Sequence, residues 1–341
     1  MAIGPVPTNL NLFLSDLTTA FGTVYLTDPL EANWQAIATE VPINTEQYVA
    51  AWTGMMPKAK VWQGPRNVYS PAPQTYTVIP KPFEITYGMD RFQLDDDKHG
   101  VYFRMVPDMV RQTRRWQAYE IRDMLENTGN WTGAYQLGLD GLTFFNTAHP
   151  VDIYQSASGT YCNDFSGGGQ NVTYTKANGG TVSILTGGGF GQTAFKTAWE
   201  YMPTIKGEDG ERLGVRGMTL MHPVNLRGEV EVVLHNTFFA PPTWGSTNLG
   251  TQVGAGENYF KRLGVVPYEN EFLNDPQMWY LADTSRSFKP VMWGLREGWK
   301  MVPRYNEDDP VVFDEHFYLI GGWARGCPLW NYSFLMLRSG P

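Results

Sequence analysis

Residues 82–128 decide the fold of this chain, and they begin with PFEITYG at residues 82–88, which is typical of a strand. An acidic turn, DDDK at residues 95–98, comes next. A long and strongly polar helix is then predicted from Pro107, because proline is favoured at a first helical position, and Gly129 ends it. About twenty helical residues form a rod of about 30 Å. The thin apolar stripe along it predicts a helix that lies on a sheet.

The segment before this strand combines many prolines with large apolar side chains. Proline cannot donate a hydrogen bond to a sheet, so residues 50–81 predict at most a two-stranded hairpin. An isolated hairpin is only marginally stable in water, and we therefore expect a neighbouring subunit to cover it. The candidate interface side chains of this segment are Trp52, Met55, Met56 and Trp62.

The charge of the chain is acidic overall and unevenly distributed. A formal net charge of −8 argues against a dedicated DNA-binding protein, which needs a basic surface for phosphate contacts. No Lys or Arg precedes Lys58, and no Asp or Glu lies between Lys58 and Phe83. Two interpretations stay open: either both segments are solvated, or an acidic N-terminal arm contacts a basic loop of another subunit. The second interpretation involves Asp16, Asp28, Glu31 and Glu40 in the arm, and Lys58, Lys60 and Arg66 in the loop.

Length and cysteine content limit the architecture and the compartment. The 341 residues exceed the roughly 250–300 over which a single core grows, so two lobes are predicted. Cys162 and Cys327 are too few for a disulfide framework or a zinc site, which indicates a reducing cytoplasm. The N-terminus lacks the features of a secretion signal, and no apolar run reaches the roughly 18 residues that span a bilayer. We therefore expect no association with a membrane.

No residue pattern identifies a metal site or a catalytic group. Residues 95–97 are three aspartates, but they lack the spacing and the closing Glu of a calcium loop. The five histidines are scattered without a metal-binding pair, and no G-x-S-x-G nucleophile motif occurs. The sequence therefore predicts no catalytic, cofactor-binding or metal-binding residue.

Residues 181–194 match the residue spacing of a nucleotide-binding motif. A predicted strand is followed by Gly189, Gly191 and Ala194 in the spacing G-x-G-x-x-A, which opens a predicted helix. A nucleotide pyrophosphate could bind at the N-terminus of that helix. However, the acidic residues 208–209 lie in a polar turn rather than at the end of a second parallel strand. A nucleotide-dependent enzyme is therefore only an alternative interpretation.

The second half of the chain alternates short helices and strands. The Gly- and Ser-rich residues 154–190 predict a surface insertion or a domain boundary. A helix at residues 192–201, a buried strand at residues 218–221 and a helix from Pro223 predict a compact α/β lobe. The strongest late strands are predicted at residues 313–323 and 330–337.

Several segments together resemble the Mu-like phage major head subunit, or gpT, family. The first are WTGMMP at residues 52–57, WQGPR at 62–66, the Phe83-Glu84 strand, Asp90-Arg91 and the helix into Leu125. The others are LDG at residues 139–141, FFNTAHP at 144–150, WYLADTSR at 279–286, Lys289-Pro290, Val312-Phe313 and GWAR at 322–325. Each motif is weak alone, but their order and spacing over most of residues 46–341 are fairly specific.

The resemblance implies an α+β protein with the Hong Kong 97-type capsid fold. This fold has an N-terminal arm, an extended loop, a peripheral lobe with a spine helix, and an axial α/β lobe. The domains implied for this chain are residues 1–45 for the arm, 46–81 for the extended loop, 82–153 with 296–341 for the peripheral domain, 154–184 for a Gly/Ser-rich insertion, and 185–295 for the axial domain.

The resemblance also implies the function of a major capsid protein of a tailed double-stranded DNA bacteriophage. Copies of the chain would assemble as hexamers and pentamers into an icosahedral head that holds the genome without specific DNA binding. A separate scaffolding protein and a portal are expected partners, and a decoration protein is compatible with this role. Assembly would take place in the host cytoplasm, and the product would be the virion capsid. A compartment shell of the same fold that stores cargo enzymes is the nearer alternative.

Overall fold

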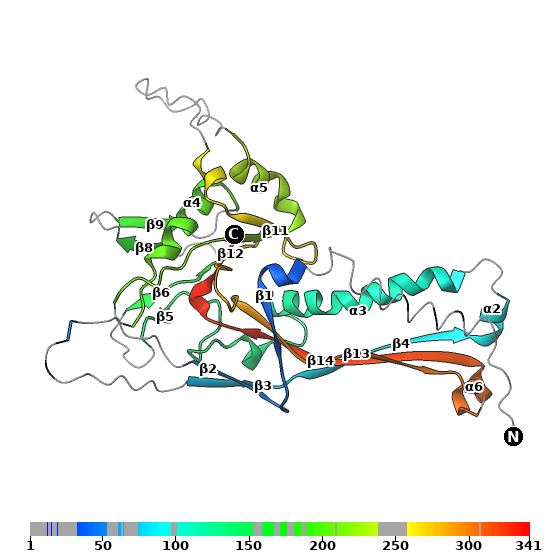
Figure 1. Ribbon diagram of the computed structural model, residues 1–341. Coiled ribbons are helices and arrows are strands. Elements are labelled where there is room, and N and C mark those ends of the chain that lie inside the picture. The colour runs from blue at the N-terminus through cyan, green and yellow to red at the C-terminus, as the bar shows by residue number, and fades with distance from the viewer. Residues whose placement is uncertain are drawn as a thin grey trace.

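The structure, a computed structural model, is organised by two sheets. A long four-stranded sheet carries helix α3 (Val101–Leu125) along one side, and a shorter five-stranded sheet is flanked by helices α4 (Gln192–Tyr201) and α5 (Arg227–Leu234) (Figure 1). The structure describes residues 12, 15, 19, 33–52, 61–62, 64, 74–96, 101–152, 159–166, 171–175, 181–185, 189–208, 210–237, 258–306 and 308–341.

The long sheet has the strand order β1-β13-β14-β4. Strand β1 (Ala38–Pro42) runs parallel to β13 (Val291–Arg304), whereas β14 (Phe317–Trp330) is antiparallel to both β13 and β4 (Lys81–Asp90). Strand β4 confirms the strand predicted at residues 82–88. The pairing of β13 with β14 has two register shifts, one on each side of Glu297, where β13 carries extra residues. Such bulges bend and twist a strand locally.

Helix α3 begins six residues before the predicted position. Pro107 lies inside it rather than at its first position, so this part of the prediction was wrong. An internal proline removes one backbone hydrogen bond, but the helix continues through it. Its inner face explains why: Ala118, Ile121 and Leu125 are buried in the hydrophobic cluster that also contains Trp293 of the long sheet. Tertiary packing therefore outweighs the local preference of proline for a helix start.

The contact between α3 and the long sheet centres on Trp116. Its ring lies edge-on to Trp293, with 4.8 Å between the ring centroids, and also contacts Phe83 and Trp299 at 5.0 and 5.5 Å. The helix can approach this closely because position 326 on β14 is glycine. A Cβ atom there would lie 2.7 Å from Cζ2 of Trp293 and 3.1 Å from Cη2 of Trp116. This spacing leaves no room for a side chain.

The five-stranded sheet has the order β11-β10-β12-β15-β7 and carries a second core. Its strands are β7 (Asp164–Phe165), β10 (Thr219–His222), β11 (Val266–Glu269), β12 (Trp279–Ala282) and β15 (Met336–Ser339). Helix α4 confirms the helix predicted at residues 192–201. The strand predicted at residues 218–221 is β10, one residue later. The helix predicted from Pro223 begins as a 3₁₀ turn, η4 (Val224–Leu226), and continues as α5.

The end of the chain does not stay in the long sheet. Strand β14 ends at Trp330, the turn η6 (Ser333–Leu335) redirects the chain, and β15 then pairs with β12. The side chain of Asn331 fixes this corner by donating to the carbonyl oxygen of Lys289 at 3.0 Å. The continuous strand predicted at residues 330–337 was therefore wrong. Residues 331–341, predicted with the peripheral domain, supply a strand of the other sheet.

Two more segments differ from the predicted organisation. Residues 33–42, predicted as part of the N-terminal arm, form η1 (Asn33–Ala36) and strand β1 of the long sheet. Within the predicted insertion 154–184, β7 pairs with β15, and Arg338 binds Asp164 with its guanidinium at 2.5 Å. Burial alone would raise the pKa of Asp164, but the hydrogen bonds and charge of Arg338 hold that pKa below its usual value. β7 is therefore fixed in the sheet.

The remaining elements are small. They are the strand pairs β2 (Tyr48–Trp52) with β3 (Gln74–Val78), β5 (His149–Pro150) with β6 (Thr160–Tyr161), and β8 (Asn171–Thr175) with β9 (Thr181–Leu185), helices α2 (Arg91–Asp95) and α6 (Pro310–Glu315), and the 3₁₀ turns η2 (Gly133–Gln136), η3 (Met202–Thr204) and η5 (Tyr259–Arg262). Among the residues that the structure describes, no helix combines the length and the apolar character needed to cross a bilayer.

We expect Trp116→Ala to lower the free energy of unfolding by about 3–5 kcal/mol, because it removes a buried ring and leaves a cavity. Trp323→Ala on the same sheet is the control. Its side chain is 41% exposed, so about 1 kcal/mol is expected. Urea unfolding followed by circular dichroism measures both values. Equal losses would contradict the central role of Trp116.

Candidate functional site

The hairpin of β2 and β3 projects from the end of the molecule that lies opposite α2 and α6 (Figure 1). Its base is attached to the body, since Ala50 and Val78 are buried and the hydroxyl of Tyr76 donates to the carbonyl oxygen of Trp330 at 2.6 Å. Two strands are what the sequence predicted for residues 50–81. Four other described apolar side chains of this segment are exposed: Val49, next to Ala50 in β2, Val61 and Trp62 between the two strands, and Ile79, directly after β3.

Among the predicted interface residues of the loop, Trp62 is the one whose side chain the structure describes. Its side chain is 73% exposed, and its indole N–H donates to the carbonyl oxygen of Gly64 at 2.7 Å. This bond holds the ring on the surface, which agrees with a role as an anchor for another molecule. The backbone of Trp52 lies in β2. The other predicted loop residues, Met55, Met56, Lys58, Lys60 and Arg66, lie outside the described residues.

The predicted acidic arm is described only in part. Leu12, Ser15 and Thr19 are helical, whereas Asp16, Asp28 and Glu31 lie outside the described residues. Glu40 is exposed on β1, and partial burial raises the pKa of its carboxyl group. Because β1 is hydrogen-bonded to β13, Glu40 has a fixed position on the long sheet rather than on a free arm. The contact of arm acids with loop bases stays a prediction.

A second exposed surface was missed by the sequence analysis. Phe92 on α2, Phe313 on α6 and Phe317 at the start of β14 are all exposed at the far end of the long sheet. Residues 313–323 were predicted as a strand, but β14 starts only at Phe317. The missed signal is Asp309-Pro310: the Asp309 carboxylate accepts a hydrogen bond from the Val311 N–H, and proline occupies the first helical turn of α6.

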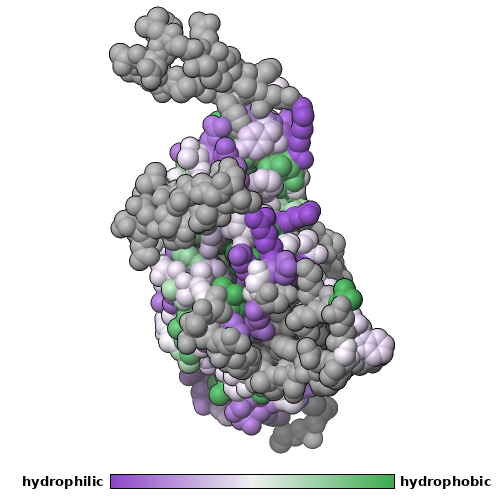
Figure 2. All heavy atoms as spheres, turned by 90° about the vertical axis from the view of Figure 1, so that its left-hand side faces the viewer, coloured by the Kyte–Doolittle hydropathy of each residue, from purple (hydrophilic) through white to green (hydrophobic). Residues whose placement is uncertain are grey.

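The face at the hairpin end of the molecule is mixed in polarity. On the face shown in Figure 2, the described apolar and polar side chains alternate in small groups and do not gather into one large apolar area. The exposed ring of Trp62 is an apolar surface in addition to these small groups.

A buried polar cluster lies beneath the segment at residues 137–150. Nδ1 of His149 lies 2.5 Å from a carboxylate oxygen of Asp140, and its Nε2 lies 3.0 Å from the carbonyl oxygen of Phe144. The amide of Asn163 donates to the same carbonyl and to that of Ser333. The cluster joins three distant segments, which is a structural role. In the described part of the chain, no group of three or more His, Cys, Asp or Glu is placed to hold a metal ion.

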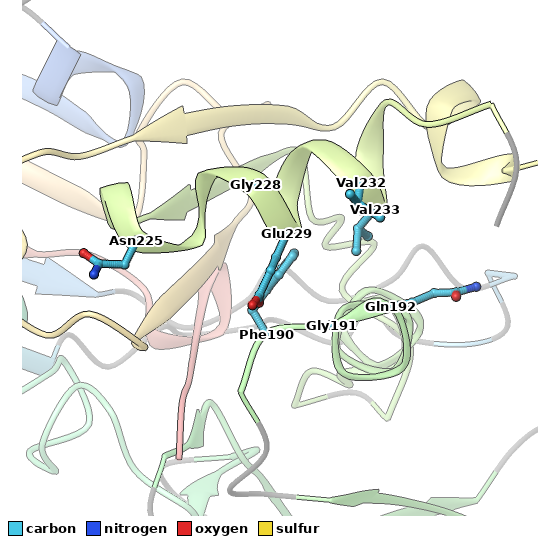
Figure 3. A pocket seen from close by; sticks show the side chains of 8 residues that line it. All are labelled: Phe190, Gly191, Gln192, Asn225, Gly228, Glu229, Val232 and Val233. Atoms are coloured by element: carbon cyan, nitrogen blue, oxygen red, sulfur yellow. The ribbon is translucent and has the colours of Figure 1, made fainter. Parts of the chain in front are cut away.

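The Gly189 motif lines an open pocket of about 460 Å³ between α4 and α5 (Figure 3). The walls are formed by Phe190, Gly191, Gln192, Asn225, Gly228, Glu229, Val232 and Val233. Strand β9, which precedes the motif, is antiparallel to β8 in a separate two-stranded sheet, so the parallel arrangement of a dinucleotide site is not formed there. The carboxylate of Glu229 would also repel a phosphate. The pocket does not have the geometry of a nucleotide site.

We therefore expect that neither ATP nor NAD raises the melting temperature of the protein. A ligand present at 100 times its dissociation constant would add about 2.7 kcal/mol to the free energy of unfolding. Differential scanning fluorimetry over a nucleotide concentration series measures this effect, and Gly191→Ala is the matched variant. A dose-dependent increase that the Gly191→Ala substitution removes would contradict this expectation.

Comparison with known proteins assigns the chain to a family. The Mu-like prophage major head subunit gpT family matches residues 11–175 and 265–336, which is more than half of the chain. The chain is similar to the major capsid protein of Escherichia phage Mu, with 23% identity over 274 residues, 65% of this chain and 87% of that protein. It is also similar to the Mu-like prophage FluMu major head subunit of Haemophilus influenzae, with 29% identity over 120 residues, 35% of this chain and 37% of that protein.

The similarity of the fold extends to solved capsid structures. The bacteriophage JBD30 capsid has a TM-score of 0.53 and 20% identity, covering 73% of this chain and 94% of that chain. The JBD30 procapsid has a TM-score of 0.52 and 22% identity, covering 99% of this chain and 76% of that chain. These matches show the predicted Hong Kong 97-type capsid fold. Since the family match and the fold agree, the chain belongs to the Mu-like prophage major head subunit gpT family and is a major capsid protein of a tailed phage.

Proposed function

We propose that copies of this protein assemble as hexamers and pentamers into an icosahedral head that holds double-stranded DNA, with a separate scaffolding protein and portal. Assembly takes place in the host cytoplasm. The observation that supports this proposal best is the β2–β3 hairpin, because Val61 and Trp62, which lie between its two strands, are exposed and belong to neither core of their own chain. A neighbouring subunit that covered them would remove this apolar surface from water.

We also propose which part of the capsid fold each segment of the chain forms. The hairpin and the residues between its strands form the extended loop, and the long sheet with α3 forms the peripheral lobe. The five-stranded sheet with α4 and α5 forms the axial lobe and includes residues 331–341, because β15 pairs with β12. The arm is shorter than residues 1–45, because β1 belongs to the long sheet. One hydrophobic cluster joins the lobes, since it contains both Trp293 and Tyr280.

Electron microscopy of the purified protein tests the proposed assembly. We expect closed shells from the wild type and soluble, folded subunits without shells from Trp62→Ala, because truncation of a buried aromatic anchor typically costs about 2 kcal/mol or more. Trp62→Phe keeps an aromatic ring and is expected to retain shells. Circular dichroism checks that each variant is folded. Normal shells from Trp62→Ala would refute the role of this ring, and shells filled with protein cargo would favour a storage compartment.

We expect isolated subunits to bind duplex DNA weakly near physiological salt. The net charge is −8, and a shell that must release its genome should not retain it by phosphate contacts. Retention on a DNA column over a salt gradient measures this binding. Tight retention independent of DNA sequence at physiological ionic strength would contradict the proposed passive wall.

A further inference from the structure

His149 and Asp140 form a buried pair of ionisable side chains that the proposed function does not use. The side chain of His149 is fully buried, that of Asp140 is only 6% exposed, and Nδ1 of the ring lies 2.5 Å from Oδ2 of the carboxyl group. Asp140 lies in the motif LDG at residues 139–141, and His149 lies in FFNTAHP at residues 144–150. The protonation state of the pair follows from the atoms around the imidazole ring.

The second ring nitrogen of His149 faces two hydrogen-bond acceptors. Nε2 lies 3.0 Å from the carbonyl oxygen of Phe144 and 3.1 Å from Oδ1 of Asn163. Backbone groups fix the orientation of the Asn163 amide. Its Nδ2 donates to the carbonyl oxygens of Phe144 and Ser333, and its Oδ1 accepts from the Asn146 N–H at 2.8 Å. Since neither neighbour of Nε2 can supply a proton, Nε2 carries one and donates it.

The first ring nitrogen, Nδ1, then needs a proton as well. In a neutral ring, the lone pair of Nδ1 would point at the carboxylate of Asp140, and two lone pairs at 2.5 Å repel each other. Oδ1 of Asp140 accepts a hydrogen bond from the Leu142 N–H at 3.2 Å, which favours the ionised carboxylate. The ring of Tyr161 stacks on that of His149, with 5.2 Å between the centroids, and the face of an aromatic ring attracts a cation. The geometry is therefore that of an imidazolium paired with a carboxylate.

The ionisable groups around this pair do not replace it as a pH-sensitive element. On the elements packed against it they include Asp152, Tyr161, Cys162, Asp164, Tyr201, Tyr332 and Arg338. Burial raises the pKa of each of the three tyrosines, and it raises the pKa of the Cys162 thiol to about 12. These four groups are therefore neutral at mildly alkaline pH. Burial alone would raise the pKa of Asp164, but Arg338 holds it below its usual value, so these two side chains balance each other.

The pair lies at a junction between the two sheets. The ring of Phe144 stacks on that of Trp330, the last residue of β14, with 3.9 Å between the centroids. The carbonyl oxygen of Phe144 is the acceptor that faces His149 and Asn163. Asn163 accepts in turn from the N–H of Arg338 on β15 at 2.8 Å. Loss of the Nδ1 proton would leave a buried carboxylate without its donor at this junction, which is strongly unfavourable.

We propose that His149 is a buried imidazolium whose proton holds residues 137–150 at the junction of the two sheets, and that this junction opens as the pH rises. The direction follows from proton linkage. A histidine in the unfolded chain is neutral above about pH 7, so the folded protein binds one more proton than the unfolded chain and loses stability with increasing pH. The inference concerns the single subunit and does not depend on shell assembly.

Asp140→Asn is the variant that separates the proton from the hydrogen bond. The amide N–H of asparagine can donate to Nδ1 of a neutral ring, so the contact is kept without the additional proton. Between about pH 7.5 and 9, we expect the unfolding constant of full-length wild-type subunits to rise about tenfold more per pH unit than that of the variant. Urea unfolding followed by circular dichroism measures both. The other titrating groups are common to the two chains, so an equal pH dependence would overturn the proposal.

Nitrogen-15 NMR of the histidine rings tests the same charge in the wild type and remains decisive where Asp140→Asn does not fold. At about pH 8, both ring nitrogens of His149 should be protonated, whereas an exposed ring such as that of His235 should have one unprotonated nitrogen. The chain has five histidines, and replacing the other four by glutamine in turn identifies the His149 signals by elimination. A neutral His149 ring at this pH would refute the imidazolium.

Hydrogen exchange followed by mass spectrometry tests the opening itself. Between about pH 7.5 and 9, the protection factors of amides in residues 137–150 should fall about tenfold per pH unit in the wild type and stay constant in Asp140→Asn. Peptides from α4 should change less, because this helix belongs to the other core. Constant protection of residues 137–150 in the wild type would show that the proton does not hold them. An equal fall in α4 would show unfolding of the whole subunit, and it would also overturn the proposed opening.

Discussion

The close approach of helix α3 to the long sheet is the constraint on which the rest of the structure depends. Trp116 can reach Trp293, Trp299 and Phe83 only because the sheet offers a glycine at position 326 beneath it. The buried rings continue into the cluster that also holds Tyr280 of the five-stranded sheet. A single layer of aromatic packing therefore both fixes the rod-like helix on the sheet and connects the two sheets.

Features of the fold that local patterns encode could be predicted from the sequence. The strand at residues 82–88, the helix at residues 192–201 and the two-stranded hairpin depend on short-range periodicity and on where proline is tolerated. The start of α3 and the path of the last residues depend on distant partners. Pro107 lies inside a helix whose inner face is buried. Strand β15 pairs with β12, which lies more than fifty residues earlier in the chain. No local pattern carries that information.

The same distinction applies to the candidate surfaces. The exposed loop could be predicted because its large side chains had no core to enter, and Trp62 is indeed on the surface. The exposed phenylalanines at the far end of the long sheet could not be predicted as a surface, because Phe313 was read as part of a strand whereas it lies on a short helix capped by Asp309. The Gly189 motif is a pattern that the sequence shows but the structure does not support. Its spacing is that of a nucleotide site, but β9 is antiparallel to β8, so the parallel strands of such a site are not formed there.

The two register shifts in β13 have a consequence for a protein that must tile a closed surface. A regular ladder resists bending, whereas extra residues on one strand concentrate twist and curvature at one place. The shifts around Glu297 separate the well-packed part of the long sheet near Trp293 from the part that reaches α2 and α6. The two extra residues therefore set the twist and the direction with which the outer part of the sheet leaves the core near Trp293. In the proposed shell, the angle at which neighbouring subunits meet would then depend on these two extra residues as well as on the core.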